Sequence, residues 1–321
     1  MSAALSEWSL IERFFARRCP RNQATQLGIG DDCALLAIPQ GHELALTADT
    51  LVEGVHFFAD VRPDDLGHKV LAVNLSDLAA MGAEPLAVTL ALTLPRADAE
   101  WLEGFAAGFF ALAERFGVDL VGGDTTRGPL TVITVQAMGV VPEGTALRRS
   151  GARPGDDIYL TGTLGEAGLG LRLLRDKTAA ARDEAALRHL LRPEPRVAAG
   201  LALRGLASAC IDVSDGLAAD LGHLLVASGA GACLDWDALP LPSILRQEAD
   251  SGGDWRFPLE CGDDYELCFT APQENAARIE AELAALDCPL SRIGRIEAAP
   301  GLHMLRRGIR IDMEPQGYRH F

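Results

Sequence analysis

Six short acidic motifs, far apart along the chain and each containing Gly, Ser, Thr or Asn, carry the side chains best suited to chemistry. They are Gly28-Ile29-Gly30-Asp31-Asp32, Thr47-Ala48-Asp49-Thr50, Asn74-Leu75-Ser76-Asp77, Gly122-Gly123-Asp124-Thr125-Thr126, Asp212-Val213-Ser214-Asp215-Gly216 and Gly262-Asp263-Asp264. Carboxylates brought together repel one another and any phosphate unless divalent cations lie between them. Mg²⁺ takes oxygen ligands and bridges to substrate phosphates. Together the motifs predict a metal-dependent enzyme acting on phosphates.

Each motif taken alone has a structural alternative, because Gly-Asp and Ser-Asp pairs are common in turns and helix caps. The combination favours a site. Several of the aspartates closely follow apolar runs at 44–46, 118–121 and 209–211, which read as strands. Since α/β proteins assemble their sites at strand ends, we expect these aspartates to lie there.

The elements that must position these motifs follow from hydrophobic periodicity. In the first half, strands are expected at 43–48, 87–94, 119–121 and 130–141, and helices at 64–81 and 98–116. In the second half, helices are expected at 166–174, 184–191, 217–227 and 273–286, and strands at 158–161, 265–270 and 309–313. The apolar residues of helix 98–116 recur every three or four positions, which is typical of a helix packed on a sheet. The fold class is α/β.

The length of 321 residues leaves room for two domains. Between residues 144 and 157 the composition turns to Gly, Arg, Ser and Pro, which is typical of a linker. We therefore expect an N-terminal domain at 1–148 and a C-terminal α/β domain at 149–321.

Composition also excludes several classes of function. With 29 basic and 45 acidic residues, the formal charge is −16, which argues against a nucleic-acid partner. The seven cysteines, from Cys19 to Cys288, have no disulfide or zinc spacing and predict reduced thiols in a cytoplasmic protein. No run approaches the ~18 apolar residues of a membrane span, so no membrane partner is expected.

Two familiar phosphate-binding solutions are absent from the sequence. No Gly-x-x-x-x-Gly-Lys motif occurs, and neither of the two lysines, Lys69 and Lys177, follows a glycine-rich loop. The segment 161–168 follows a strand and opens a helix, so its backbone N–H groups could face a phosphate. Its glycines serve a tight turn equally well.

Four longer runs carry a resemblance to a known family. The runs 28–34, 72–83, 122–129 and 212–217 closely resemble thiamine-monophosphate kinases, and the similarity extends from about Ser9 to the C-terminus. The wider superfamily includes aminoimidazole ribonucleotide synthetase and selenophosphate synthetase. The resemblance implies a homodimer in which mixed sheets of the N-terminal domains pair into a barrel. It also implies ATP and several Mg²⁺ ions in a cleft between the domains, and transfer of the γ-phosphoryl group directly onto thiamine phosphate to give thiamine diphosphate.

The resemblance also implies roles for single residues of this chain. The implied metal ligands are Asp32, Thr47, Asp49, Asp77, Asp124, Asp212 and Asp215, with Asp31 as a neighbour. The implied ATP-binding residues are Gly123, Asp124, Arg149 and Ser214, and His56, Asp263 and Tyr318 are implied to face thiamine phosphate. Two positions depart from the family pattern: Asp263 replaces the common Glu, and Ala48 replaces the common Thr.

The chemistry of phosphoryl transfer agrees with these roles, because it needs positioning and charge neutralisation above all. The acceptor is a phosphate monoester with a second pKa near ~6, so we expect no general base. Structural alternatives exist for three residues: Arg149 as a solvated loop side chain, His56 as a cap, and Tyr318 as an anchor of the tail. Two other functions fit the motifs, namely a synthetase of the same superfamily acting on a purine precursor, and a sensor that binds nucleotide or thiamine phosphate without turnover.

Overall fold

The computed structural model describes residues 6–16, 22–176 and 184–320. Cys19 and Lys177 lie outside the described residues. The chain packs as two compact units: an N-terminal unit of residues 1–78 and 83–144, and a C-terminal unit of residues 79–82 and 145–321. The domain bounds expected from composition, 1–148 and 149–321, stay a prediction.

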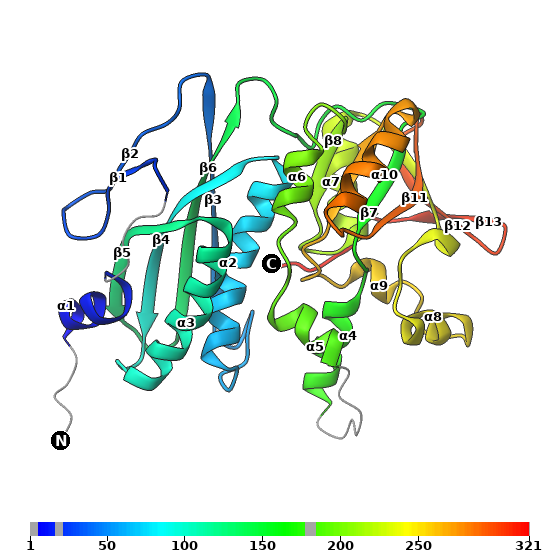
Figure 1. Cartoon of the computed structure of the whole chain (residues 1–321). Coiled ribbons are helices and arrows are strands. Elements are labelled where there is room, and N and C mark those ends of the chain that lie inside the picture. Colours follow the sequence, from blue (N-terminus) through cyan, green and yellow to red (C-terminus); the bar gives the residue numbers. More distant parts are fainter. Residues whose placement is uncertain (1–5, 17–21, 177–183, 321) are drawn as a thin grey trace. The chain divides into compact units, whose positions relative to one another are not determined.

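The N-terminal unit is built on a four-stranded mixed sheet with the order β3-β6-β4-β5 (Figure 1). β6 pairs antiparallel with both β3 and β4, whereas β4 and β5 are parallel. A separate pair, β1 and β2, is antiparallel. The strands are β1 Thr25–Leu27, β2 Leu35–Leu36, β3 His42–Val52, β4 Glu84–Leu94, β5 Asp119–Arg127 and β6 Val132–Pro142.

Two long helices, α2 (Pro63–Ala80) and α3 (Ala99–Phe116), lie on the same side of this sheet (Figure 1). They approach each other so closely at Gly108 that a Cβ there would lie 1.9 Å from the carbonyl oxygen of Asp64. Asp98 caps α3 by accepting from the N–H groups of Glu100 and Trp101. The predicted apolar stripe of α3 is confirmed, since Phe105 and Phe109 are fully buried. The first described elements are α1 (Glu7–Leu10) and a π-helical turn (Ile11–Phe15).

The C-terminal unit is built on a seven-stranded mixed sheet with the order β13-β12-β9-β11-β7-β10-β8. Its strands are β7 Asp157–Thr161, β8 Ala209–Asp212, β9 Gly231–Asp235, β10 Leu267–Ala271, β11 Leu290–Glu297, β12 Gly301–Arg306 and β13 Ile309–Met313. Its α-helices are α4 Glu166–Arg175, α5 Glu184–Leu191, α6 Val197–Ala202, α7 Leu217–Ser228, α8 Ser243–Asp250, α9 Phe257–Glu260 and α10 Ala276–Ala285, with 3₁₀ turns at Trp236–Ala238 and Gln273–Asn275. One core of buried apolar side chains joins the sheet to α7.

The predicted two-domain α/β class is confirmed, and so is the mixed sheet of the N-terminal unit. Two of the strands that differ in length from the prediction change the position of site residues. The strand expected at 43–48 continues to Val52, and the strand expected at 119–121 continues to Arg127. Asp49 and Asp124 therefore lie inside strands, and the expectation that they follow strand ends is wrong. Gly123 lies within β5 at a φ of 148°. Only glycine fits there, because a Cβ would come 1.9 Å from the Leu90 carbonyl oxygen.

Two further boundaries shift in the C-terminal unit. The strand expected at 265–270 begins at Leu267, since Tyr265 has a positive φ of 50°. The helix expected at 273–286 starts as a 3₁₀ turn, and α10 begins only at Ala276. Among the described residues, none of the helices combines the length and apolar character needed to span a membrane.

Candidate functional site

The C-terminal unit brings four of the expected site residues together at the dipeptide Ser214-Asp215, which follows β8. The carbonyl oxygen of Ser214 accepts a hydrogen bond of 2.8 Å from the N–H of Asp263. The next carbonyl oxygen, that of Asp215, accepts one of 2.9 Å from the N–H of Tyr318. Residues far apart in the sequence thus meet through their backbones. We call this arrangement the Ser214-Asp215 junction.

Glycines allow the three segments of the junction to approach this closely. A Cβ at Gly262 would lie 2.1 Å from the Ser214 carbonyl oxygen, and one at Gly317 would lie 2.5 Å from the Asp215 carbonyl oxygen. No other residue fits such backbone contacts, because real Cβ atoms do not approach carbonyl oxygens at these distances. The glycine of the Gly262-Asp263-Asp264 motif is therefore explained by packing.

Asp220, in the first turn of α7, accepts hydrogen bonds from the backbone N–H groups of the same junction. One oxygen of its carboxylate accepts from the N–H groups of Ser214, Asp215 and Gly216 at 3.0, 3.0 and 3.1 Å. The residue is 3 % exposed, and burial raises the pKa of its carboxyl to about 7, against the opposing effect of these N–H donors. Sequence reasoning missed Asp220. The available signal was an aspartate in the first turn of a helix that follows an acidic glycine motif.

The turn that carries Asp263 has an unusual backbone. Asp263 and Tyr265 both have positive φ values, 71° and 50°, and the hydroxyl of Tyr265 donates to the Asp263 carboxylate at 3.1 Å. Between them, Asp264 is buried and accepts from the N–H groups of Gly165 and Ala167 at 2.8 and 3.2 Å. Burial raises the pKa of Asp264 to about 8. The turn is fixed from both sides and holds Asp263 on the junction.

The contacts of Asp264 also correct the expectation for the loop at 161–168. The N–H groups of Gly165 and Ala167 donate to Asp264, and those of Gly162 and Leu164 donate to the carbonyl oxygens of Pro289 and Pro240. These donors are used inside the protein. The idea that they face a phosphate is wrong, and the glycines serve the tight turn.

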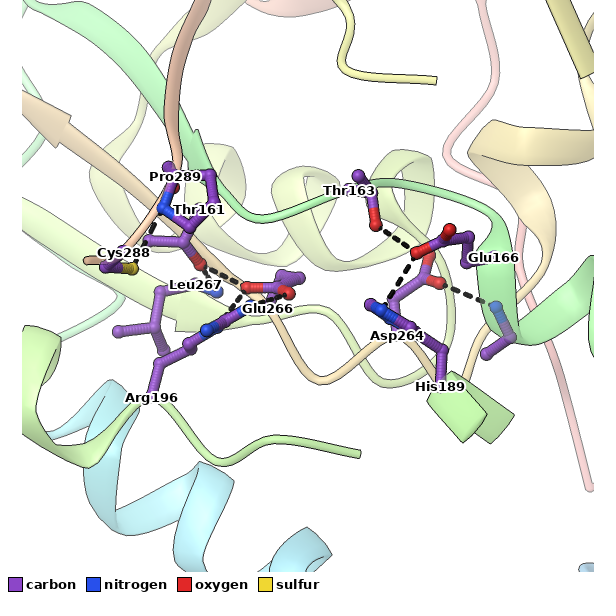
Figure 2. A network of polar contacts seen from close by, with 11 residues as sticks. Thr161, Thr163, Glu166, His189, Arg196, Asp264, Glu266, Leu267, Cys288 and Pro289 are labelled. Carbon is purple, nitrogen blue, oxygen red and sulfur yellow. Dashed lines mark hydrogen bonds and ion pairs between the residues drawn. The ribbon is translucent and has the colours of Figure 1, made fainter. Parts of the chain in front are cut away.

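Figure 2 shows the polar network that surrounds this loop. The Glu266 carboxylate, 2 % exposed, forms two bonds of 2.7 and 2.6 Å with the Arg196 guanidinium and accepts from the Thr161 hydroxyl at 2.6 Å. Nearby, His189 forms an ion pair of 2.9 Å with Glu166, which also accepts from Thr163. The first set of contacts joins the segment before α6 to Glu266, which precedes β10, and the second joins α4 to α5. Glu266 lies three residues after Asp263.

The ion pair of His189 and Glu166 predicts a pH-dependent stability. The hydrogen bond to Glu166 raises the pKa of His189, and the bond to His189 lowers the pKa of Glu166. The contribution of His189 to the stability of the folded state is complete below the pKa of the unfolded-state histidine, and it is lost as the pH rises through the raised folded-state pKa. The contribution of Glu166 to that stability is present above the pKa of the unfolded-state glutamate, and it is lost as the pH falls through the lowered folded-state pKa.

We expect the pair to stabilise most near pH 6. At that pH, His189→Gln should lower the melting temperature by about 2–4 °C. The deficit should shrink as the pH rises through the raised pKa of His189 and as it falls through the lowered pKa of Glu166. Differential scanning calorimetry of both proteins across this range checks the window, with Glu166→Gln as the reciprocal variant. A deficit that does not change with pH contradicts the assignment.

In the N-terminal unit, three of the expected metal ligands meet between β3 and α2. The Thr47 hydroxyl donates to the carboxylate of Asp77. The backbone N–H of Asp49 donates to the side chain of Asn74 at 3.2 Å, and Asn74 in turn donates to the carbonyl oxygen of Val70. Asn74 is fully buried and fixes β3 against α2. Sequence reasoning placed Asn74 in a motif but gave it no role.

The remaining expected residues of this unit lie elsewhere on it. Asp32 is exposed, between β1 and β2, and its N–H donates to the Asp31 carboxylate at 2.8 Å. His56 follows β3, and its Nδ1 accepts from the N–H of Val52 at 3.0 Å, so the neutral ring carries its proton on Nε2. This bond agrees with the capping alternative for His56 and leaves its role toward substrate a prediction.

Gly123 and Asp124 lie on β5, at the sheet edge opposite to β3. Three strand spacings separate the two edges, which amounts to about 14 Å. Asp124 pairs with Ala91 of β4, which pairs with Thr134 of β6. Within one chain, the sheet therefore keeps Asp124 apart from Thr47 and Asp49.

Two exposed residues complete the expected set. Arg149 lies in the loop before β7, where its carbonyl oxygen accepts from the Ser228 hydroxyl at 3.1 Å. Tyr318 is 47 % exposed although its backbone is held on the junction, and its ring stands edge-on to that of His320 at 4.9 Å. The backbone of Tyr318 is thus held in place, while its ring is exposed enough for another planar ring to stack on it.

The acidic residues do not form a complete metal site within any one part of the structure. Across residues 6–16, 22–176 and 184–320, no three His, Cys, Asp or Glu side chains are grouped to hold a metal ion. The donors that do meet, the Thr47 hydroxyl and the Asp77 carboxylate, supply only hard oxygen atoms. This donor chemistry fits Mg²⁺ and does not fit a zinc site, which takes nitrogen and sulfur ligands.

Comparisons with known proteins connect this arrangement to a family. Residues 30–141 match the model of the AIR synthase related protein, N-terminal domain, and residues 153–305 match the corresponding C-terminal domain. The thiamine-monophosphate kinases of Salmonella typhimurium and Escherichia coli K12 are each 48 % identical over 322 residues, covering 99 % of this chain and 99 % of theirs.

Solved structures give the same result. The crystal structure of thiamine-monophosphate kinase from Stenotrophomonas maltophilia is 49 % identical with a TM-score of 0.85, covering 94 % of this chain and 97 % of that one. A structure of AaThiL complexed with AMPPCP and TMP is 31 % identical with a TM-score of 0.78, covering 89 % of each chain. Hydrogenase maturation protein HypE, at 23 % identity and a TM-score of 0.80, shares the fold. The resemblance read from the motifs is confirmed, and the chain belongs to the thiamine-monophosphate kinase family.

Proposed function

We propose that the chain phosphorylates thiamine monophosphate with ATP to give thiamine diphosphate, by direct in-line transfer of the γ-phosphoryl group. The observation that carries the proposal is the Ser214-Asp215 junction. It joins a residue expected to contact ATP and a residue expected to bind metal to two residues expected to face thiamine phosphate. A solved relative is complexed with AMPPCP, an ATP analogue, and with TMP, this substrate.

The chain's own residues would divide the work as follows. Thr47, Asp49 and Asp77 offer oxygen donors on β3 and α2. Asp212, the last residue of β8, and Asp215, which follows that strand, offer carboxylates. Bound Mg²⁺ ions would neutralise the phosphate charges and hold the two substrates in line. Asp263 and Tyr318 would orient the acceptor, with the aromatic face of Tyr318 attracted to the cationic thiazolium ring. The acceptor phosphate is largely ionised at neutral pH, so no general base is needed.

We also propose that the active enzyme is a homodimer whose N-terminal sheets adjoin. Edge strands with unpaired backbone groups need cover, and β3 and β5 are both edges of their sheet. Leu44 and Leu46 of β3 are 44 % and 56 % exposed, which is costly for side chains facing water. A second copy covering this region would bury them.

The six described cysteines are free thiols, which supports a cytoplasmic location.

The decisive experiment is detection of product from the purified chain. With ATP, Mg²⁺ and thiamine monophosphate, chromatography should show thiamine diphosphate and an equal amount of ADP, and a chelator should abolish both. Free thiamine should not serve as acceptor. ATP consumption without thiamine diphosphate would instead indicate a synthetase of the superfamily, and binding without consumption would indicate a sensor.

A further inference from the structure

Asp220 is buried beside the Ser214-Asp215 junction but belongs to none of the acidic motifs that suggested ligands. One of its two carboxylate oxygens, Oδ2, accepts hydrogen bonds from three consecutive backbone N–H groups, all within 3.1 Å. Backbone N–H groups that converge in this way can bind an external anion. Here the protein fills it with its own carboxylate.

Two consequences follow for the dipeptide Ser214-Asp215. Its N–H groups are committed to Asp220, so they are not available to a nucleotide phosphate. Its two carbonyl oxygens accept from Asp263 and Tyr318. All four backbone polar groups of the dipeptide are therefore hydrogen-bonded. The position of the dipeptide sets the positions of Asp263 and Tyr318, which donate to it. Asp220 supplies the only side chain among these contacts.

We propose that Asp220 is a positioning residue for the kinase reaction, which anchors the ATP-binding and metal-binding dipeptide and, through it, both thiamine-facing residues. This inference rests on the proposed function. Asp220 would touch neither substrate nor metal. Its effect would pass through the backbone of residues 214–216, and it should therefore alter the use of ATP and of thiamine monophosphate together.

The variant Asp220→Asn tests this with the smallest change of shape. The measurements are made at about pH 8.5, where the Asp220 carboxylate is charged. The amide keeps one acceptor oxygen, but hydrogen bonds to a neutral acceptor are roughly half as strong as bonds to a charged one. Three bonds weaken at once, and the dipeptide gains freedom. We expect the affinity for AMPPCP in the presence of Mg²⁺ to fall about tenfold in calorimetry, and the KM values for ATP and thiamine monophosphate to rise together.

Asp156→Asn is the matched control. Asp156 is also a buried aspartate of the C-terminal unit, 5 % exposed, and accepts from the N–H of Arg153 and the hydroxyl of Ser208. Neither of these two hydrogen bonds involves a junction residue, that is, Ser214, Asp215, Asp263 or Tyr318. Its variant should lower the melting temperature without changing the AMPPCP affinity or either KM. If Asp220→Asn behaves in the same manner, Asp220 has a structural role only and the proposal is overturned.

A measurement on the wild-type chain covers the case in which Asp220→Asn does not fold. Amide hydrogen exchange without ligand should show residues 214–216 already protected, because their N–H groups are bonded before any substrate arrives. Exchange at the rate of an open loop, with protection only after Mg²⁺ and AMPPCP are added, would overturn the proposal. A wild-type chain that binds AMPPCP but forms no thiamine diphosphate would refute the proposed function, while exchange and calorimetry would still decide the role of Asp220.

Discussion

In the homodimer proposed above, pairing an Asp49→Asn chain with an Asp124→Asn chain is expected to keep about half of the wild-type activity, although each variant alone should lose orders of magnitude. Asp49 and Asp124 lie on strands β3 and β5, at opposite edges of one sheet. The edges are about 14 Å apart, whereas two ligands of one Mg²⁺ ion each lie about 2 Å from it. If both residues bind the same Mg²⁺ ion, they must come from two different chains.

The arithmetic of a shared site gives the expected value. One of the two sites in a mixed dimer then combines both substitutions, and the other combines two native residues. Co-expression with two different affinity tags, followed by two purification steps, isolates the mixed dimer. Its rate of thiamine diphosphate formation is compared with those of the two pure variants and of the wild-type dimer.

A reciprocal pairing supplies the control. A chain carrying both Asp49→Asn and Asp124→Asn, paired with a wild-type chain, contains one substitution in each shared site and should be inactive. If each site is built within one chain, the results exchange: this second pairing keeps half of the activity and the first keeps none. Near-normal rates in both single variants would refute the metal assignment itself.

Much of the fold could be predicted because the periodic elements are long and locally consistent. The helices at 64–81 and 98–116 were placed within about two residues of α2 and α3. The strand ends were harder to predict, for a physical reason visible at Gly123. Two glycines usually mark a loop, but here the first residue pairs with Thr89 and the second with Leu90 of β4, where the close backbone requires glycine.

The candidate site could be predicted as a set of residues but not as an arrangement. The motifs identified Ser214, Asp215, Asp263 and Tyr318, yet their meeting depends on backbone hydrogen bonds between segments up to about a hundred residues apart. A backbone contact leaves no side-chain pattern except glycine. Asp220 was missed for a related reason, because an aspartate in the first turn of a helix is an ordinary cap. The separation of Asp49 from Asp124 depends on strand order, which periodicity does not reveal.

Arg196→Ala is expected to be the most destabilising single substitution in the C-terminal unit, by about 3–5 kcal/mol, since it leaves the Glu266 carboxylate buried without its counter-ion. Glu266 is 2 % exposed and Arg196 is 16 % exposed, and their two bonds of 2.7 and 2.6 Å are shown in Figure 2. The Thr161 hydroxyl, which also donates to Glu266, receives the N–H of Leu267 and so connects the pair to β10.

Urea unfolding measures this loss as a fall of the transition midpoint by about 1–3 M. The control is Arg310→Ala. Arg310 also forms two short hydrogen bonds with a carboxylate, that of Glu297, but this pair lies at the surface, where Arg310 is 47 % exposed. Solvent screens that pair, and its midpoint should stay near that of the wild type. The double variant Arg196→Met, Glu266→Met should recover most of the stability, because no charge then remains buried without a partner. An Arg196→Ala midpoint equal to that of Arg310→Ala would mean that water reaches Glu266, and that the network around the Asp263 turn is weaker than its geometry indicates.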